Sequence, residues 1–167
     1  MKWRIRILLI VTAVLLVAGI VFMSYLLRSR NQANEYQFQI DANLAAASVA
    51  NGSEPLTDPA KAVIAEYEGR RTVVVPGNYL ALSSYLRKDA VMPFLARVDK
   101  NRALKITFCE AATLYAVPVD ASGDKVIIQL ETQGRSFTMH IRGGNLWTNL
   151  LACCMDGTYH DQNLPLE

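Results

Sequence analysis

The chain has 167 residues, of which 51% are hydrophobic and 19% are charged, and its formal net charge at pH 7 is +2. All five basic residues of the first thirty flank one apolar segment, and residues 31–167 hold twelve Lys and Arg against fifteen Asp and Glu, a net charge of −3. Nucleic-acid-binding domains are usually basic, with Lys and Arg clustered on one face, so this mildly acidic remainder argues against a nucleic-acid partner.

An uncharged apolar segment runs from Ile7 to Leu27, a length of 21 residues. At about 1.5 Å per helical residue, it is long enough to cross a bilayer core of about 30 Å. A secretory signal peptide has a shorter apolar core that ends at a small-residue cleavage site. Here the segment ends in Leu-Leu-Arg-Ser-Arg. We therefore predict an uncleaved transmembrane helix over residues 7–27, with cleavage near Ala33 as the alternative.

The basic residues on the two sides of this segment indicate its orientation. Three precede it and two follow it: Lys2, Arg4, Arg6, Arg28 and Arg30. Positive residues favour the cytoplasmic side of a membrane, and the free amino terminus adds to the first group. We predict that residues 1–6 are cytoplasmic and that the rest of the chain after the membrane helix is extracytoplasmic.

Residues 28–57 are predicted to form a stalk helix followed by a linker. Tyr36, Ile40 and Leu44 recur at helical spacing, and three consecutive alanines follow them. We expect this helix to continue from the membrane helix and to end before Gly52. The linker is rich in glycine and proline.

Residues 58–157 are predicted to form one α+β domain, which begins with helices. Asp58-Pro59 is a typical helix start and Gly69 a typical stop, so we expect a helix that buries Val63, Ile64 and Tyr67. A short strand over 71–75 and a helix over 79–88 follow. A further short helix after Asp89 is expected to bury Phe94, Leu95 and Val98.

From Leu104 onward the hydrophobic period changes from that of a helix to that of a strand. Short turns separate segments in which apolar and polar residues alternate, which indicates an antiparallel meander with one buried face. We predict a mostly antiparallel sheet of four or five strands, packed by helices on one face, with Ile128 and Phe137 buried on neighbouring strands. A last helix covers Leu146 to Met155, and residues 158–167 form an irregular tail.

Positive charge is concentrated in the middle of the chain. Residues 70–105 carry a net charge of +6, between flanking segments that are acidic. The basic residues of this block are Arg70, Arg71, Arg87, Lys88, Arg97, Lys100, Arg102 and Lys105. They either lie on solvated helix faces, paired with acidic neighbours, or form a basic surface for anionic lipid headgroups or wall polymers.

Cysteine and histidine are the residues from which a catalytic or metal site would have to be built. An extracytoplasmic location permits a disulfide from Cys109 to Cys153 or Cys154, although an odd number of cysteines leaves one over. Buried free thiols are the other interpretation. Adjacent cysteines do not have the spacing of a structural zinc site, so we expect no metal, and no other cofactor motif is present.

The polar side of the predicted meander is the candidate binding surface. Its members alternate with core residues along two strands: Lys125, Ile127, Gln129, Thr138, His140 and Arg142. An apolar residue next to Arg and His is typical of a protein interface, and Arg97 in the basic block is the competing position.

The sequence therefore favours a non-enzymatic binding or assembly module. It would be anchored in membrane lipid through residues 7–27 and would contact an envelope protein or a surface polymer. The alternative is a membrane-anchored hydrolase that uses Cys109, His140, Cys153 and His160 as nucleophile and base.

Overall fold

The computed structural model describes residues 2–51, 60–87, 89–91 and 97–155. The predicted linker around Gly52, the predicted helical residues Phe94 and Leu95, and the tail over 158–167 lie outside these residues, as does His160.

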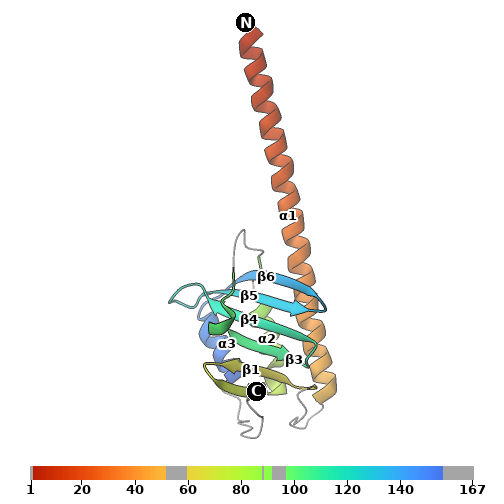
Figure 1. Cartoon of the computed structure of the whole chain (residues 1–167), viewed down its shortest axis with the longest axis vertical. Coiled ribbons are helices and arrows are strands. Elements are labelled where there is room, and N and C mark those ends of the chain that lie inside the picture. The colour runs from red at the N-terminus through yellow and green to blue at the C-terminus, as the bar shows by residue number, and fades with distance from the viewer. Residues whose placement is uncertain (1, 52–59, 88, 92–96, 156–167) are drawn as a thin grey trace.

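One continuous helix, α1 (Lys2–Asn51), contains both the apolar segment and the predicted stalk (Figure 1). Its first half projects away from the rest of the protein, and none of its most apolar part is buried. Its second half buries a stripe on the globular domain: Tyr36, Ile40, Leu44 and Ala47. The helix is thus long and apolar enough at one end to cross a bilayer, and packed into the protein core at the other.

Six strands of the described residues form a single antiparallel sheet: β1 (Val63–Tyr67), β2 (Arg70–Val73), β3 (Leu104–Phe108), β4 (Ala112–Pro118), β5 (Lys125–Thr132) and β6 (Arg135–Arg142). Their order is β2-β1-β3-β4-β5-β6. The α+β class and the antiparallel meander are therefore confirmed, with a strand count slightly above the predicted four or five.

The predicted helix before Gly69 is wrong, because this segment forms the β1–β2 hairpin. Val63 and Ile64 are β-branched, and both are buried although successive strand residues face opposite sides of the sheet. Glu68 and Gly69 form the two-residue turn and both have positive φ, 50° and 75°, as a twisted hairpin requires. Burial on both faces hides the alternation that would have identified a strand.

The other helices are short. A 3-10 turn, η1 (Pro76–Asn78), leads into α2 (Tyr79–Arg87), a second one, η2 (Lys100–Arg102), precedes β3, and α3 (Leu146–Met155) follows β6. Both α2 and α3 agree with the predicted ranges. The predicted short helix after Asp89 is not seen in its described part, where Val98 is partly buried in irregular chain.

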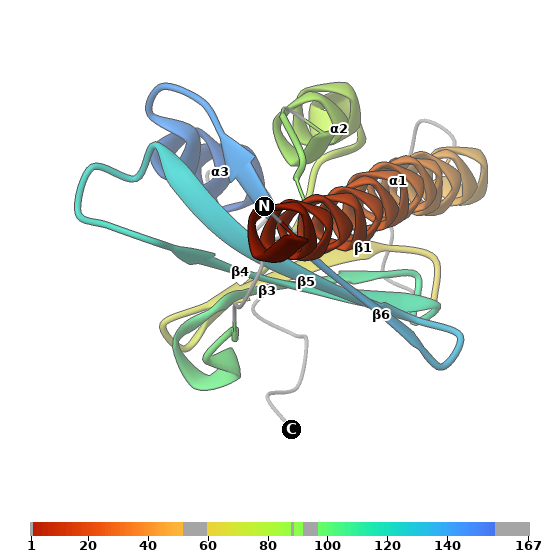
Figure 2. The ribbon, with the colours of Figure 1, turned by 90° about the horizontal axis from the view of Figure 1, so that it is seen from above.

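The helices α1, α2 and α3 lie on one face of the sheet, as Figure 2 shows. Ile128 and Phe137 are buried on the adjacent strands β5 and β6, as predicted. Tyr36 ties α1 to α2, because its hydroxyl donates a hydrogen bond of 2.9 Å to the Leu86 carbonyl oxygen. Burial in the core raises the pKa of the Tyr36 phenol far above its usual range.

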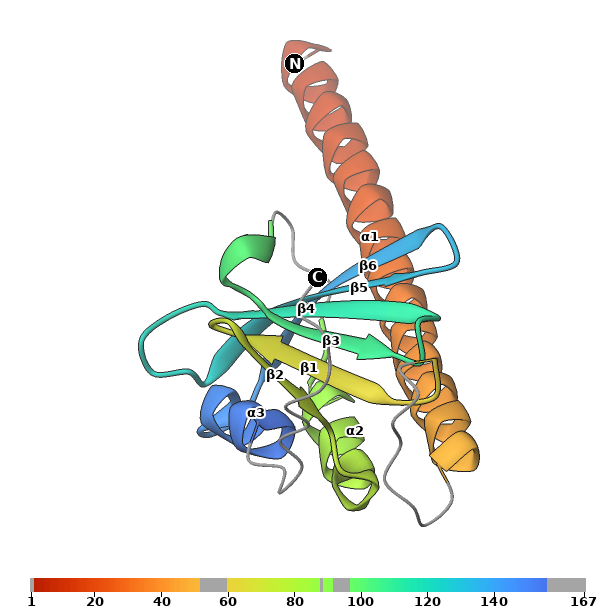
Figure 3. The same cartoon turned by 60° about the horizontal axis from the view of Figure 1, so that its bottom comes forward.

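Polar contacts fix the direction in which α1 leaves the domain. Asp41 accepts a 2.9 Å hydrogen bond from Ser83 and lies 3.0 Å from the Arg87 guanidinium. Nearer the apolar half, Glu35 pairs with Arg135 at the start of β6. Figure 3 shows the strands following one another from β2 to β6 toward the apolar half of α1. One edge of the sheet, β6, therefore lies closest to that half, and the β1–β2 hairpin is at the opposite edge.

Candidate functional site

Five of the six residues predicted as binding residues lie together on the sheet face that the α-helices leave uncovered. Ile127 is opposite His140 and Gln129 is opposite Thr138, while Arg142 is opposite Lys125. All of them alternate with buried residues of β5 and β6. We call this set the open-face patch: Lys125, Ile127, Gln129, Thr138, His140 and Arg142. Arg97 is exposed in irregular chain and belongs to no strand.

His140 is the most constrained member of the open-face patch. Its backbone N–H and C=O both bond to Val91, at 2.7 and 2.9 Å, on the outer edge of β6. Burial, and then the positive charges of Arg142 and Lys125, lower the pKa of its imidazole, so the ring is neutral at pH 7. Its Nε2 atom is buried and has no hydrogen-bond partner among the described residues.

Part of the face is covered, but by neither the stalk nor the C-terminal tail. The segment that contains η2 crosses it, on the side of the sheet opposite the α-helices (Figure 2). Lys100 lies 4.7 Å from the centroid of the Tyr115 ring and 2.6 Å from the Glu131 carboxylate. Gln129 donates a 2.8 Å hydrogen bond to the same carboxylate. The η2 turn is thus fixed on the strands beside the open-face patch.

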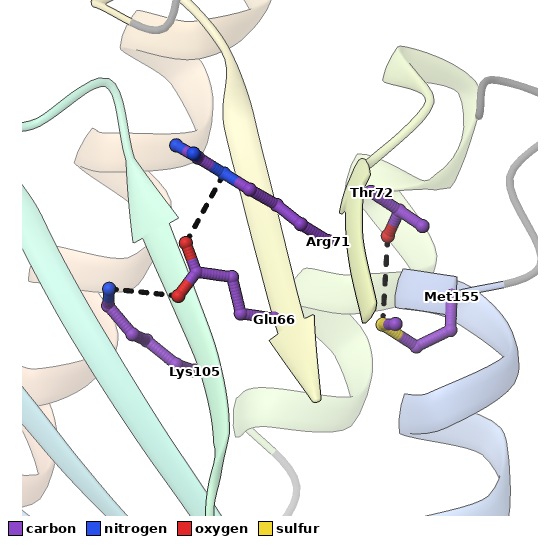
Figure 4. Close-up of polar contacts among 5 residues, drawn as sticks. All are labelled: Glu66, Arg71, Thr72, Lys105 and Met155. Carbon is purple, nitrogen blue, oxygen red and sulfur yellow. Dashed lines mark hydrogen bonds and ion pairs between the residues drawn. The ribbon is translucent and has the colours of Figure 1, made fainter. Parts of the chain in front are cut away.

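A second polar site, which sequence reasoning did not identify as such, lies at the β1–β2 hairpin. A hollow of about 250 Å³ is lined by four basic and two acidic residues: Arg70, Arg71, Lys100, Lys105, Glu66 and Glu68. Figure 4 shows the Glu66 carboxylate between two cations, 3.3 Å from Arg71 Nε and 3.0 Å from Lys105 Nζ. We call this hollow the hairpin pocket.

A further hollow of about 340 Å³ adjoins the hairpin pocket. It shares four lining residues with that pocket, Tyr67, Glu68, Asn101 and Ala103, and adds Arg102, Asp99 and two apolar residues of β4. The ring of Tyr67 packs edge-on against Trp147 of α3, with centroids 5.5 Å apart. The hairpin turn therefore stands between two connected depressions.

The basic block seen in the sequence is the signal for this site. Four of its members line the hairpin pocket and Arg102 lines the adjoining hollow. Arg87 lies elsewhere, paired with Asp41 on the helix side, and Lys88 is outside the described residues. Segments that are far apart in the sequence had to meet before the convergence became visible.

The three cysteines are free thiols in the structure. Cys109 donates to the Lys61 carbonyl at 3.3 Å, whereas Cys153 donates to the Asn78 carbonyl at 3.5 Å. Burial raises the pKa of all three thiols. Protonated thiols are poor nucleophiles and metal ligands.

The chain around the cysteine pair serves packing. Thr72 on β2 donates a 2.8 Å hydrogen bond to the Cys154 carbonyl and lies 3.6 Å from Met155 Sδ, a contact drawn in Figure 4. Among the residues that the structure describes, no group of three or more His, Cys, Asp or Glu side chains is placed to hold a metal ion.

The fold and these sites define a small α+β domain that is built onto one long helix with an apolar free half. Comparison with family models, with curated proteins and with solved structures found no match. The functional argument therefore depends on the geometry of this chain alone.

Proposed function

We propose that the protein is a single-pass membrane protein whose domain is a non-enzymatic binding or assembly module outside the cytoplasm. The free half of α1 supports the membrane part, because its 21 uncharged residues are not covered by the domain. Such a surface is unfavourable in water and favourable in a bilayer. The excess of positive residues before the span supports a cytoplasmic amino terminus.

The membrane assignment can be tested directly. The intact chain should remain in membranes after high-salt and alkaline washing, and protease added from the non-cytoplasmic side should digest residues 31–167. A released product that lacks residues 1–33 would mean that the apolar segment is a cleaved signal.

The open-face patch is the contact surface that we propose for a macromolecular partner, an envelope protein or a surface polymer. The observation that carries this proposal is the buried Nε2 of His140, which has no partner among the described residues. A buried polar atom without a hydrogen bond costs about 1–3 kcal/mol, and a partner that supplies a donor or acceptor there would recover it. Ile127 and Arg142 next to it are the residue types that interfaces use.

Site-specific photo-crosslinking in native membranes tests this surface. A probe at position 140 of the full chain should capture a defined partner, and Arg142→Glu should abolish that capture. A probe at Leu80, which is 84% exposed on α2, is the matched control on the helix side. Capture from position 97 but not from 140 would move the contact to the basic block.

The alternative function, a membrane-anchored Cys/His hydrolase, has no supporting observation among the described residues. Hydrolysis by a Cys–His pair needs a thiolate and a base within hydrogen-bond reach. The described thiols bond to backbone carbonyls and have raised pKa values.

A further inference from the structure

We propose that the hairpin pocket binds an oxyanion, the phosphate or carboxylate group of an extracytoplasmic ligand. The extracytoplasmic part of this statement rests on the proposed function, whereas the binding of an anion does not. The inference starts from charge: the pocket concentrates positive residues in a domain whose net charge is negative.

The acidic residues of the pocket do not cancel its positive charge. Glu66 is shared between Arg71 and Lys105, so one carboxylate faces two cations. Figure 4 shows that Arg71 presents only its Nε to Glu66, while the rest of the guanidinium extends past the carboxylate. Arg70 adds an exposed guanidinium from the next position of β2. An anion placed there would receive charge-assisted hydrogen bonds, which are about twice as strong as neutral ones.

The cations are held in place before any ligand arrives. Lys100 is positioned by Glu131 and by the face of the Tyr115 ring, and both contacts come from outside the pocket. The Glu131 carboxylate also raises the pKa of Lys100, which keeps the ammonium group charged. Side chains that are already ordered lose less conformational entropy when they bind a ligand.

Size limits the ligand. The hollow of about 250 Å³ is smaller than the roughly 300–1,000 Å³ of pockets for drug-sized molecules, so it suits a small anion or one charged unit of a longer chain. The adjoining hollow beyond Tyr67 and Glu68 gives such a chain a direction in which to continue. Arg102 would meet its next unit there.

Position limits the source of the anion. The β1–β2 hairpin is at the sheet edge opposite β6, which lies nearest the apolar half of α1 (Figure 1). Neighbouring strands are about 4.8 Å apart, so five spacings place this edge about 24 Å beyond β6. Headgroups of the protein's own bilayer therefore do not reach the pocket, and a surface polymer or solute supplies the anion.

The test uses the full ¹⁵N-labelled chain in phosphatidylcholine nanodiscs. Inorganic phosphate and glucuronate are titrated at constant ionic strength, while the amide signals of Gly69 and Asn101 are followed by NMR. Saturable shifts with either probe support the proposal, and the probe that binds more tightly identifies the group as phosphate or carboxylate. No saturable shift with either probe would overturn it.

Two exposed arginines of the same basic block form a matched pair of variants. Arg70→Glu should weaken the binding of the probe at least about ten-fold, as expected for loss of a charge-assisted contact, whereas Arg97→Glu should leave it unchanged. Equal weakening by both would mean that the anion is attracted only by overall charge and would refute a built pocket.

The lipid arm and the crosslinking result separate the remaining cases. Replacing phosphatidylcholine with phosphatidylglycerol should not change the affinity for the probe; competition by the lipid would refute the placement of the pocket away from the bilayer. Anion binding without crosslinking from position 140 would leave this inference standing while the proposed contact surface failed, and the reverse result would separate them equally clearly.

Discussion

At the scale of single residues, the alternation along β5 assigns opposite roles to neighbours. Ile128 is fully buried against the helices, while Ile127 lies on the open face. Ile128→Ala and Phe137→Ala should each destabilise the protein by about 2–5 kcal/mol because each leaves a cavity in the core. Ile127→Ala is the matched control and should cost much less.

Trp147 provides the measurement, since it packs on Tyr67 within the domain. In a Trp3→Phe background its fluorescence follows unfolding of the domain in micelles, without a contribution from the membrane segment. Equal losses of stability at positions 127 and 128 would show that the register of β5 is wrong.

Tyr36 adds a dependence on pH. Its phenol is buried and its folded-state pKa is raised far above 10, whereas the unfolded phenol ionises near pH 10. The folded state therefore holds a proton that the unfolded state loses, and stability should fall as the pH rises above about 10. Tyr36→Phe should be less stable at neutral pH by about 0.5–1.5 kcal/mol, through loss of the bond to Leu86, but should show a shallower alkaline decline. Parallel pH profiles of the two proteins, measured by denaturant titration, would contradict this.

At the scale of elements, two glycines with nearly the same backbone angle separate strain from contact. Gly69 has φ of 75° and open space around an added Cβ, whereas Gly123 has φ of 70° and its Cβ would meet Trp147 Cβ at 2.9 Å. Gly69→Ala should cost about 1 kcal/mol for the backbone alone. Gly123→Ala should cost about 1–3 kcal/mol more, because the turn before β5 would be pushed off α3. Chemical denaturation of both variants gives the comparison, and equal costs would mean that this turn does not pack on α3.

The elements that the sequence predicted are those whose burial is one-sided. Strands β5 and β6 alternate strictly because one face is core, and α2 and α3 have one apolar stripe each. The β1 strand was missed because Val63, Ile64 and Ala65 are all buried, which removes the period of two. The turn that follows begins with Glu68, a residue that rarely has positive φ, so no Asn-Gly or Asp-Gly pair marked the hairpin.

The sites divide in the same way. The open-face patch follows from alternation along two consecutive strands, so its grouping could be predicted. The hairpin pocket needs β2, η2 and β3 to meet, and this depends on the β1–β2 hairpin that the sequence did not indicate. The orphaned Nε2 of His140 likewise depends on Val91, which joins β6 through a single bridge.

At the scale of the whole molecule, the unbroken α1 fixes the domain relative to the bilayer. About nine residues separate Leu27 from the buried Tyr36, which corresponds to a rise of about 13 Å. A fluorophore at Val91, on the outer edge of β6, should therefore transfer energy efficiently to acceptor lipids, while one at Gly69 should not. Insertion of a flexible glycine segment after Arg30 should reduce this difference. Equal transfer from both positions in the unaltered chain would show that the domain tumbles freely.

A continuous helix also acts as a lever. A flexible tether would let the hairpin pocket sweep a volume, whereas α1 holds it at one height above the membrane, so only ligands present in that layer can be reached. Transmembrane helices adjust their tilt to bilayer thickness, commonly by about 20°. Over a lever arm of about 37 Å, such a tilt moves the far edge of the sheet sideways on the order of 12 Å. Local membrane thickness would thereby set the lateral reach of a binding site that never touches lipid.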